Sequence, residues 1–297
     1  MDFLAEISNI FDINILCDEP MKKHTSLGVG GNAKFYVDIK SLYSLNCAVN
    51  IAKKHKIPYK IIGNGTNLLV SDKGYDGVVF CTKNLSDVFM KQDEIYAMCG
   101  ASISKLVEFS KEKHLGGLEF LMGIPATVGG AIAMNAGAFG FSISDKISAI
   151  ETISNGKLKR YNPEDCRFSY RRSKFLTCKE IIVSATFKLN ESCLEDIKNK
   201  MSFYTEKRKT AQPTGRSCGS VFKNPKGQSA GKLIESAGLK GYGTTNCHVS
   251  EKHGNFIITN AGATSQDVYS LIRYIKKTIK EKFKLTLKEE VEFVGDF

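Results

Sequence analysis

Apolar and polar positions alternate in a way that predicts short strands and amphipathic helices along the first 70 residues. Residues 33–39 and 59–62 predict strands, and apolar side chains at three- and four-residue spacing predict a helix over 41–56 between them. A glycine-rich turn at 63–67 follows, and residues 68–70 are apolar again. This order of strand, helix, strand and turn indicates an α+β or α/β fold.

The middle of the chain continues this pattern. Residues 102–113 predict a second helix, and strands return around 147–153 and 181–189. The side chains of that helix expected to face inward are Ile103, Leu106 and Val107, together with Phe109 or Ser110. Residues 211–262 are rich in Gly, Asn and Pro and predict irregular structure.

Two later helices are expected to begin at capping boxes, Ser192-x-x-Glu195 and Thr264-x-x-Asp267. The inward side chains of the first helix are expected to be Leu194, Ile197, Met201 and Tyr204. Those of the second are expected to be Val268, Leu271, Ile272, Ile275, Ile279 and Phe283. Alternating residues near the end of the chain predict a last strand, with Val291 and Phe293 on one side and Glu290 and Glu292 on the other.

Composition and charge narrow the class of protein. Apolar residues make up 42% and charged residues 25% of the 297 positions, which is typical of a globular protein and argues against disorder or a coiled coil. The net charge of +11 suits anionic ligands, although a generally lysine-rich composition explains it as well. The net charge is the only feature that supports a nucleic-acid-binding function, because no RRM, KH or helix-turn-helix pattern occurs.

Targeting and cysteine patterns point to a cytoplasmic protein. No apolar run approaches the roughly 18 residues of a membrane span, and the acidic N-terminus does not resemble a signal peptide. The nine cysteines include no CxxC pair, so we expect small buried thiols with neither a disulfide framework nor a metal site. The five histidines show no metal-ligand spacing.

Two glycine-rich segments could hold a ligand against the main chain. In Gly63-Asn64-Gly65-Thr66-Asn67, glycine allows a sharp turn whose N–H groups could cradle a phosphate, although an ordinary tight turn is an equal alternative. The segment is not a Rossmann fingerprint, because strand rather than helix follows it. Residues 116–140 are small and nearly uncharged, which suits close packing against an extended ligand, or a buried core crossing.

Three further segments carry chemical groups. Arg171 and Arg172 adjoin in Tyr170-Arg171-Arg172-Ser173, and a guanidinium can hold a carboxylate in two hydrogen bonds, although a solvated turn is the default. Ser220 follows a glycine in residues 217–225, but no GxSxG elbow or partner histidine supports a hydrolase. Glu290 on the last strand is by default a solvated carboxylate.

These segments together, from about His24 to Gly295, resemble the family of UDP-N-acetylenolpyruvoylglucosamine reductases. Residues 24–33 resemble the N-terminal segment of the family, residues 63–70 its flavin diphosphate loop and residues 117–140 its flavin-contacting signature. The segments at 170–173, 219–225 and 290–291 resemble its three active-site motifs. The short interval between Ser173 and Ser220 resembles the family type that lacks a substrate-capping insertion.

The resemblance implies an α+β fold, in which a pair of FAD-binding domains of the vanillyl-alcohol-oxidase (PCMH) type precedes a C-terminal α+β substrate-binding domain. We place the three parts at residues 1–85, 86–190 and 191–297. Ala126 stands where the family has glycine, so that turn cannot need a glycine-only conformation. Thr66 and Phe139 replace the Ser and Tyr common in the family.

The resemblance also implies roles for individual residues. The catalytic residues would be Arg171, which binds the substrate carboxylate, Ser220, which donates a proton, and Glu290, protonated or sharing a proton beside the developing anion. The residues that would contact FAD are Gly63, Asn64, Gly65, Thr66, Asn67, Leu68, Gly123, Ile124, Pro125, Ala126, Thr127, Gly129, Gly130, Asn135, Ala136 and Gly137. Tyr170, Arg171, Lys223 and Asn224 would contact the substrate, and Lys223, Arg208 and Arg216 remain open as ligands of its diphosphate.

The implied reaction is reduction of UDP-N-acetylglucosamine enolpyruvate to UDP-N-acetylmuramate for peptidoglycan synthesis, with non-covalent FAD as cofactor and NADPH as co-substrate. We expect a cytoplasmic monomer whose activity serves cell-wall formation, and so cell shape and division, with no nucleic-acid or membrane partner. An FAD-dependent oxidase or dehydrogenase of a small alcohol or hydroxy acid, on the same fold, is the alternative. Such an enzyme would not need Arg171, Ser220 and Glu290 together.

Overall fold

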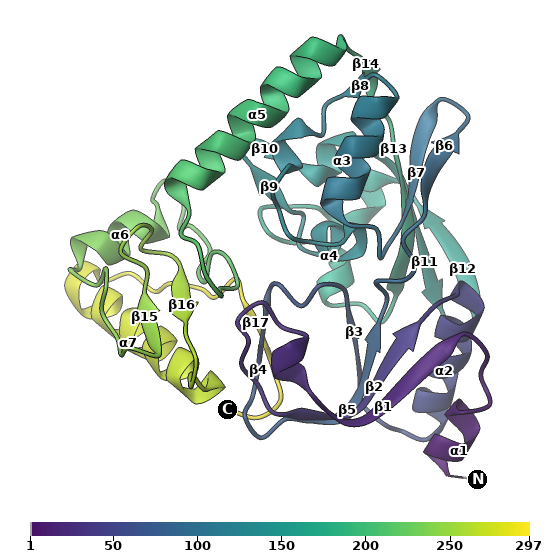
Figure 1. The fold of residues 1–297 in the computed structure, drawn as a ribbon, viewed down its shortest axis with the longest axis horizontal. Helices are drawn as coiled ribbons and strands as arrows, with labels where there is room; N and C mark the ends of the chain where they lie inside the picture. Colours follow the sequence, from purple (N-terminus) through teal and green to yellow (C-terminus); the bar gives the residue numbers. More distant parts are fainter. Residues whose placement is uncertain (1) are drawn as a thin grey trace. The chain divides into compact units, whose positions relative to one another are not determined.

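The computed structural model describes residues 2–297 and divides them into two units (Figure 1). Unit 1 comprises residues up to Leu16, Phe35–Asn64 and Gly77–Arg208. Unit 2 comprises Cys17–Lys34, Gly65–Asp76 and Lys209–Phe297. The chain therefore passes several times from one unit to the other.

Most of a four-stranded sheet in the order β1-β2-β5-β3 belongs to unit 1, and its strands β3 and β5 run parallel. The elements of this part are α1 (Phe3–Ile7), β1 (Ile13–Pro20), β2 (Asn32–Ile39), α2 (Leu42–Lys54), β3 (Tyr59–Ile62) and β5 (Tyr75–Cys81). Ser41 and Ser44 form a capping box at the start of α2. The inward stripe of α2 includes Leu45, Val49 and Ala52, as its spacing predicts.

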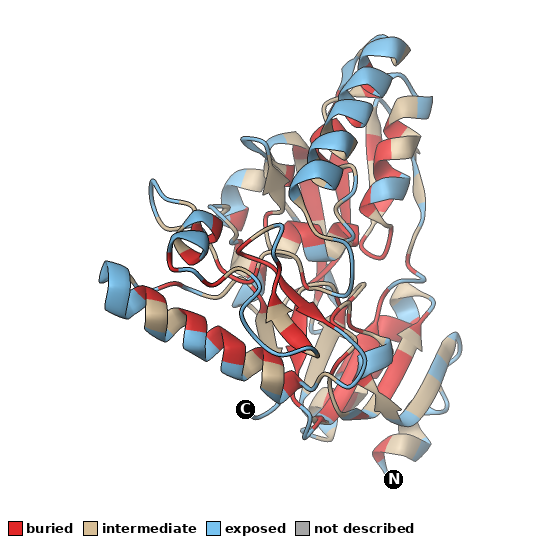
Figure 2. Ribbon diagram, turned by 60° about the vertical axis from the view of Figure 1, so that its left-hand side comes forward, coloured by how far each residue is buried: buried red, intermediate tan, exposed pale blue. Residues whose placement is uncertain are grey.

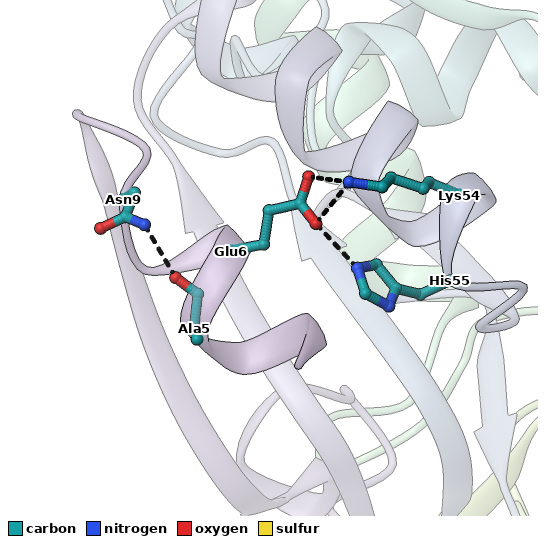
Figure 3. A network of polar contacts seen from close by, with 5 residues as sticks. All are labelled: Ala5, Glu6, Asn9, Lys54 and His55. Atoms are coloured by element: carbon teal, nitrogen blue, oxygen red, sulfur yellow. Dashed lines mark hydrogen bonds and ion pairs between the residues drawn. The ribbon is translucent and has the colours of Figure 1, made fainter. Parts of the chain in front are cut away.

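A polar cluster joins α1 to α2 (Figure 3). The carboxylate of Glu6 accepts hydrogen bonds from Lys54 Nζ at 2.8 Å and lies 2.9 Å from His55 Nε2. The hydrogen bond from Lys54, followed by that from His55, lowers the pKa of Glu6. Lys54 lies in the last turn of α2, where its positive charge interacts favourably with the negative end of the helix dipole.

The second part of unit 1 is a five-stranded antiparallel sheet in the order β12-β11-β13-β7-β6. Its strands are β6 (Val88–Lys91), β7 (Glu94–Met98), β11 (Ile147–Ser154), β12 (Lys157–Tyr161) and β13 (Ile181–Phe187). Two helices, α3 (Ile103–Glu112) and α4 (Val128–Ala133), pack against it. Ser110 rather than Phe109 is the fourth buried residue of α3. Two short ribbons complete this part, β8 (Leu115–Gly116) with β14 (Asn190–Glu191) and β9 (Gly137–Ala138) with β10 (Phe141–Ser142).

Unit 2 has a hydrophobic core of its own, built around one long helix. Its elements are β4 (Leu68–Val70), α6 (Ala230–Ser236), β15 (Cys247–Val249), β16 (Ile257–Thr259), α7 (Ser265–Phe283) and β17 (Glu292–Val294). The capping box of Thr264 and Asp267 is confirmed, and α7 buries one face while its other face is exposed (Figure 2). Strands β17 and β4 pair in parallel.

The structure corrects four predictions. Helix α5 (Leu194–Ala211) takes its first main-chain hydrogen bond from Ile197 N–H to Cys193 O, so Cys193 and not Ser192 holds the cap position. Phe283 at the end of α7 is exposed, because the helix ends there at Lys284. Residues 211–262 are not wholly irregular, since they contain α6, β15 and β16. The last strand is shorter than predicted, and Glu290 precedes it.

Candidate functional site

The turn after β3 has the tight geometry that its glycines predict. Gly65 has a φ of +63°, and a Cβ there would lie 1.9 Å from the carbonyl oxygen of His24. The same turn is tied to the N-terminal segment of unit 2 by a hydrogen bond from Ser26 N–H to Gly65 O at 3.2 Å. Only glycine fits at this position, because any side chain would displace the main chain of residue 24.

Within unit 1, this turn meets the long small-residue segment. A Cβ on Gly63 would lie 2.1 Å from Thr127 Oγ1, and Asn64 Nδ2 donates a hydrogen bond to Pro125 O at 3.1 Å. Thr127 caps α4, because its hydroxyl accepts from Gly130 N–H at 3.4 Å. The structure therefore brings together residues from the two segments that resemble the flavin-binding motifs.

Close packing continues along α4, where a Cβ on Gly129 would lie 2.9 Å from Cys99 Cβ. Burial raises the pKa of the Cys99 thiol to about 12, so it is an inert part of the core. Ala126, the residue that replaces a family glycine, is absent from the described positions with positive φ, as expected.

Three hydrogen bonds join the Arg171 turn to the segment at 133–139. Asn135 Nδ2 donates to Ser169 O at 3.0 Å, Arg171 Nη2 donates to Gly137 O at 2.7 Å, and Ser173 Oγ donates to Ala133 O at 2.7 Å. Ser173 is fully buried and Arg171 is half-buried. Arg171 is therefore built into unit 1 and is not a residue of a solvated turn.

Three residues of these two segments have left-handed backbone conformations. Asn135, Phe139 and Arg171 have φ values of 45°, 55° and 52°, in the left-handed region that residues other than glycine rarely adopt. Each such residue costs on the order of 1 kcal/mol and persists only where surrounding contacts hold it. Here the hydrogen bonds between the two segments hold these conformations.

In unit 2, the Ser220 loop lies between two other segments. Ser220 forms a bridge with Phe256, while Glu290 N–H donates to Val221 O at 2.8 Å. The loop turns at Gly219, which has a φ of +75°. The main chain of the predicted glutamate is thus hydrogen-bonded to the residue that follows the predicted proton donor.

A buried thiol, that of Cys218, lies two residues before Ser220. Burial raises the pKa of Cys218 to about 12, and the Glu290 carboxylate contributes in the same direction. The thiol itself is too deeply buried to act as a nucleophile.

Asn67 holds the position of Glu290. Its Nδ2 donates to Glu290 O at 3.0 Å, and its carbonyl accepts from Glu292 N–H at 2.9 Å. The sequence placed Asn67 in the flavin loop, and the structure adds that its amide also fixes the glutamate segment. Leu68, the next residue of the predicted flavin loop, is buried in β4.

Lys223 and Asn224 follow the Ser220 loop. Lys223 N–H donates to Lys288 O at 2.9 Å, and Asn224 Oδ1 accepts from Ala230 N–H, also at 2.9 Å. Asn224 therefore supports the first turn of α6 with its carbonyl oxygen. Arg216, another candidate for the diphosphate, is exposed and packs its side chain over Gly28.

Two residues make supporting contacts that the motifs did not predict. Asn255 is buried, accepts from Phe222 N–H at 2.9 Å and donates to Phe222 O at 2.8 Å. Arg208 donates to the carbonyl oxygens of Phe120 and Met122. Neither position has a local pattern that would reveal its partner, and Arg208 was expected only as a possible ligand of the substrate diphosphate.

Among residues 2–297, no group of three or more His, Cys, Asp or Glu side chains could hold a metal ion. Within the same residues, no helix has the length and apolar character needed to cross a membrane.

Comparison with known proteins gives matches over nearly the whole chain. A family model described as UDP-N-acetylenolpyruvoylglucosamine reductase, C-terminal domain, matches residues 211–294, and one described as FAD binding domain matches residues 33–159. A UDP-N-acetylenolpyruvoylglucosamine reductase of Caldanaerobacter subterraneus subsp. tengcongensis is 43% identical, covering 100% of this chain and 98% of the relative. One from Clostridium botulinum is 41% identical, covering 99% and 97%.

A solved structure agrees with these matches. The UDP-N-acetylenolpyruvylglucosamine reductase of Thermus caldophilus superposes with a TM-score of 0.82 at 34% identity, covering 95% of this chain and 99% of that one. The FAD-binding fold with a C-terminal reductase domain, expected from the motifs, is confirmed.

Proposed function

Because the chain belongs to the family of UDP-N-acetylenolpyruvoylglucosamine reductases, we propose that it uses FAD and NADPH to reduce UDP-N-acetylglucosamine enolpyruvate to UDP-N-acetylmuramate. The observation that carries the proposal is the fixed setting of Arg171, Ser220 and Glu290, each held by hydrogen bonds of its own segment. We further propose that the protein acts as a cytoplasmic monomer in peptidoglycan precursor synthesis, and so supports cell shape and division.

The residues of the predicted FAD site fit a bound diphosphate. The main-chain N–H groups of Asn64, Gly65 and Thr66 donate to no group within the described part of the chain. Successive unpaired N–H groups at a glycine turn are a recurrent means of binding phosphate oxygens. When bound, FAD supplies hydride transfer, from NADPH to the enolpyruvyl alkene.

The roles that we propose for the protein follow from where charge develops. Hydride adds to the alkene carbon remote from the carboxylate, so negative charge builds on the adjacent carbon and spreads into the carboxylate. Arg171 would bind this carboxylate with its planar fork, and a donor placed where charge develops is usually the largest single contribution to catalysis. The hydrogen bond of Nη2 to Gly137 O orients the guanidinium for this role.

Ser220 would then donate a proton to the adjacent carbon, which completes the D-lactyl ether. Glu290, protonated or sharing a proton, would stand beside the same anion. The main chain of Val221 connects the two residues, because Glu290 N–H donates to Val221 O. We propose Tyr170, Lys223 and Asn224 as further contacts of the substrate.

The first experiment is a visible spectrum of the purified protein. We expect a flavin spectrum that bleaches under anaerobic NADPH and returns when UDP-N-acetylglucosamine enolpyruvate is added. A protein that neither contains nor takes up FAD would refute the proposed function. Bleaching without recovery on substrate would point to the oxidase or dehydrogenase alternative.

The second experiment separates the two half-reactions by stopped-flow. Ser220→Ala is expected to leave flavin reduction by NADPH intact and to slow reoxidation by the substrate roughly 10²–10⁴-fold, the usual worth of a general acid. Ser217→Ala, three residues earlier in the same loop, is the matched control. Equal slowing of both halves in Ser220→Ala would remove Ser220 from the proton-donor role.

A further inference from the structure

Arg208, near the end of α5, completes the hydrogen bonding of the turn that precedes the predicted flavin segment. Its Nε donates to Met122 O at 2.8 Å and its Nη2 to Phe120 O at 2.9 Å. The carbonyls of Leu118, Glu119 and Leu121 already accept main-chain hydrogen bonds within the turn. Arg208 therefore satisfies the two carbonyls that the turn itself leaves over.

The turn continues directly into the flavin segment at Gly123. Gly123 has a φ of +85°, and a Cβ there would lie 3.0 Å from Arg208 Cδ, so the arginine stem covers this glycine. Beyond it, Pro125 O accepts from Asn64 Nδ2 and Ala126 O accepts from Ile103 N–H. The start of the segment is thus held by Arg208 and its middle by Asn64 and α3.

The same guanidinium also contacts the far end of this flavin segment, at Phe139. Its central carbon lies 5.3 Å from the ring centre of Phe139, which packs on Tyr204 at 4.8 Å between ring centres. Phe139 has one of the strained φ values, so its conformation depends on such contacts. One turn of α5 therefore contacts both ends of the segment at 117–140.

The charge of Arg208 is balanced by main-chain carbonyls and not by an acid. No carboxylate in the described part of the chain forms an ion pair with it. Burial lowers the pKa of its guanidinium, and the positive charge of Arg171 acts in the same direction. A long neutral side chain could fill this space, so the two carbonyls are the physical reason for an arginine.

We infer that Arg208 is a positioning residue for FAD, which keeps residues 122–127 and Phe139 in the cofactor-binding conformation through their main chain and ring. It acts by preorganisation, because a loop that is already ordered loses less entropy when it binds. Arg208 is thereby assigned to the flavin segment and not to the substrate diphosphate. The inference rests on the proposed function only in that FAD is the cofactor.

The test compares Arg208→Met, Arg208→Lys and Lys207→Met by FAD titration of the apoprotein, followed by flavin fluorescence. Arg208→Met is expected to weaken FAD binding about 10–100-fold, the range typical when a supporting residue is removed from a bound group. Arg208→Lys is expected to recover only part of this, since an ammonium lacks the planar fork that serves two carbonyls. Lys207→Met removes the same charge from the neighbouring position and is expected to bind FAD as the wild type does.

Unfolding of the three apoproteins by urea separates positioning from bulk stability. A loss of FAD affinity with an unfolding midpoint near that of Lys207→Met supports the inference. Wild-type FAD affinity in Arg208→Met, or a loss of affinity equal in Lys207→Met, would overturn it. If the wild type itself binds no FAD, it is the proposed function that fails, so the two failures are distinct.

Discussion

Asn255 offers the sharpest test of how the Ser220 loop is held. Asn255 is 4% exposed and its side chain makes both hydrogen bonds of the main chain of Phe222, a residue that is itself 1% exposed. Asn255→Ala leaves one N–H and one C=O without a partner in the core of unit 2. Each of the two groups costs about 1–3 kcal/mol, so we expect a loss of about 2–6 kcal/mol in the free energy of unfolding.

The assay is urea unfolding in the presence of excess FAD, monitored by circular dichroism. With a slope of about 3 kcal/mol/M, the upper value for small proteins, the midpoint should fall by about 1 M. Asn260→Ala is the matched control, because Asn260 is exposed and its side chain makes one hydrogen bond, to Thr245 O at 2.7 Å. Its cost should stay within about 0.5 kcal/mol.

A second variant tests the direction of the hydrogen bonds. Asn255→Asp keeps the acceptor for Phe222 N–H but places a carboxylate oxygen against Phe222 O, so it should be destabilised as well. A loss below about 1 kcal/mol in Asn255→Ala, with an unchanged slope, would contradict the reasoning. It would mean that the main chain of Phe222 finds other partners.

Three further predictions concern unit 1 and the flavin turn. Arg171→Lys should lower turnover at least tenfold, since an ammonium cannot replace a fork, whereas Arg172→Lys at the exposed neighbouring position should match the wild type; steady-state kinetics decides. Gly65→Ala should weaken FAD binding at least tenfold, about 1.4 kcal/mol, because its Cβ would lie 1.9 Å from His24 O; unchanged affinity in a titration would disprove the clash. The pKa of Glu6 is lowered in the folded state, so its contribution to stability is present at neutral pH and lost as the pH falls below about 4; thermal midpoints of Glu6→Gln and wild type should differ at pH 7 and converge at pH 3.

The sequence by itself determined most helices and strands, because their signals are local. The spacing of apolar side chains located α2, α3 and α7, and the Thr264 capping box located the start of α7 to the residue. It failed at Ser192 and within 211–262, where α6 is only two turns long and carries too few side chains for a period to emerge. The glycine turn, the small-residue segment and the candidates Arg171, Ser220 and Glu290 were all legible as motifs of one family.

Only the tertiary structure decided what holds those motifs in place. Asn67 and Glu290 are 223 residues apart, Arg208 and Met122 are 86 apart, and Phe222 and Asn255 are 33 apart. In each pair, a side-chain amide or guanidinium forms a hydrogen bond with a main-chain carbonyl or N–H. Nearly every residue has these same main-chain groups. A local pattern cannot specify such a partner, because the choice depends on which distant segment the folded chain brings within hydrogen-bonding distance.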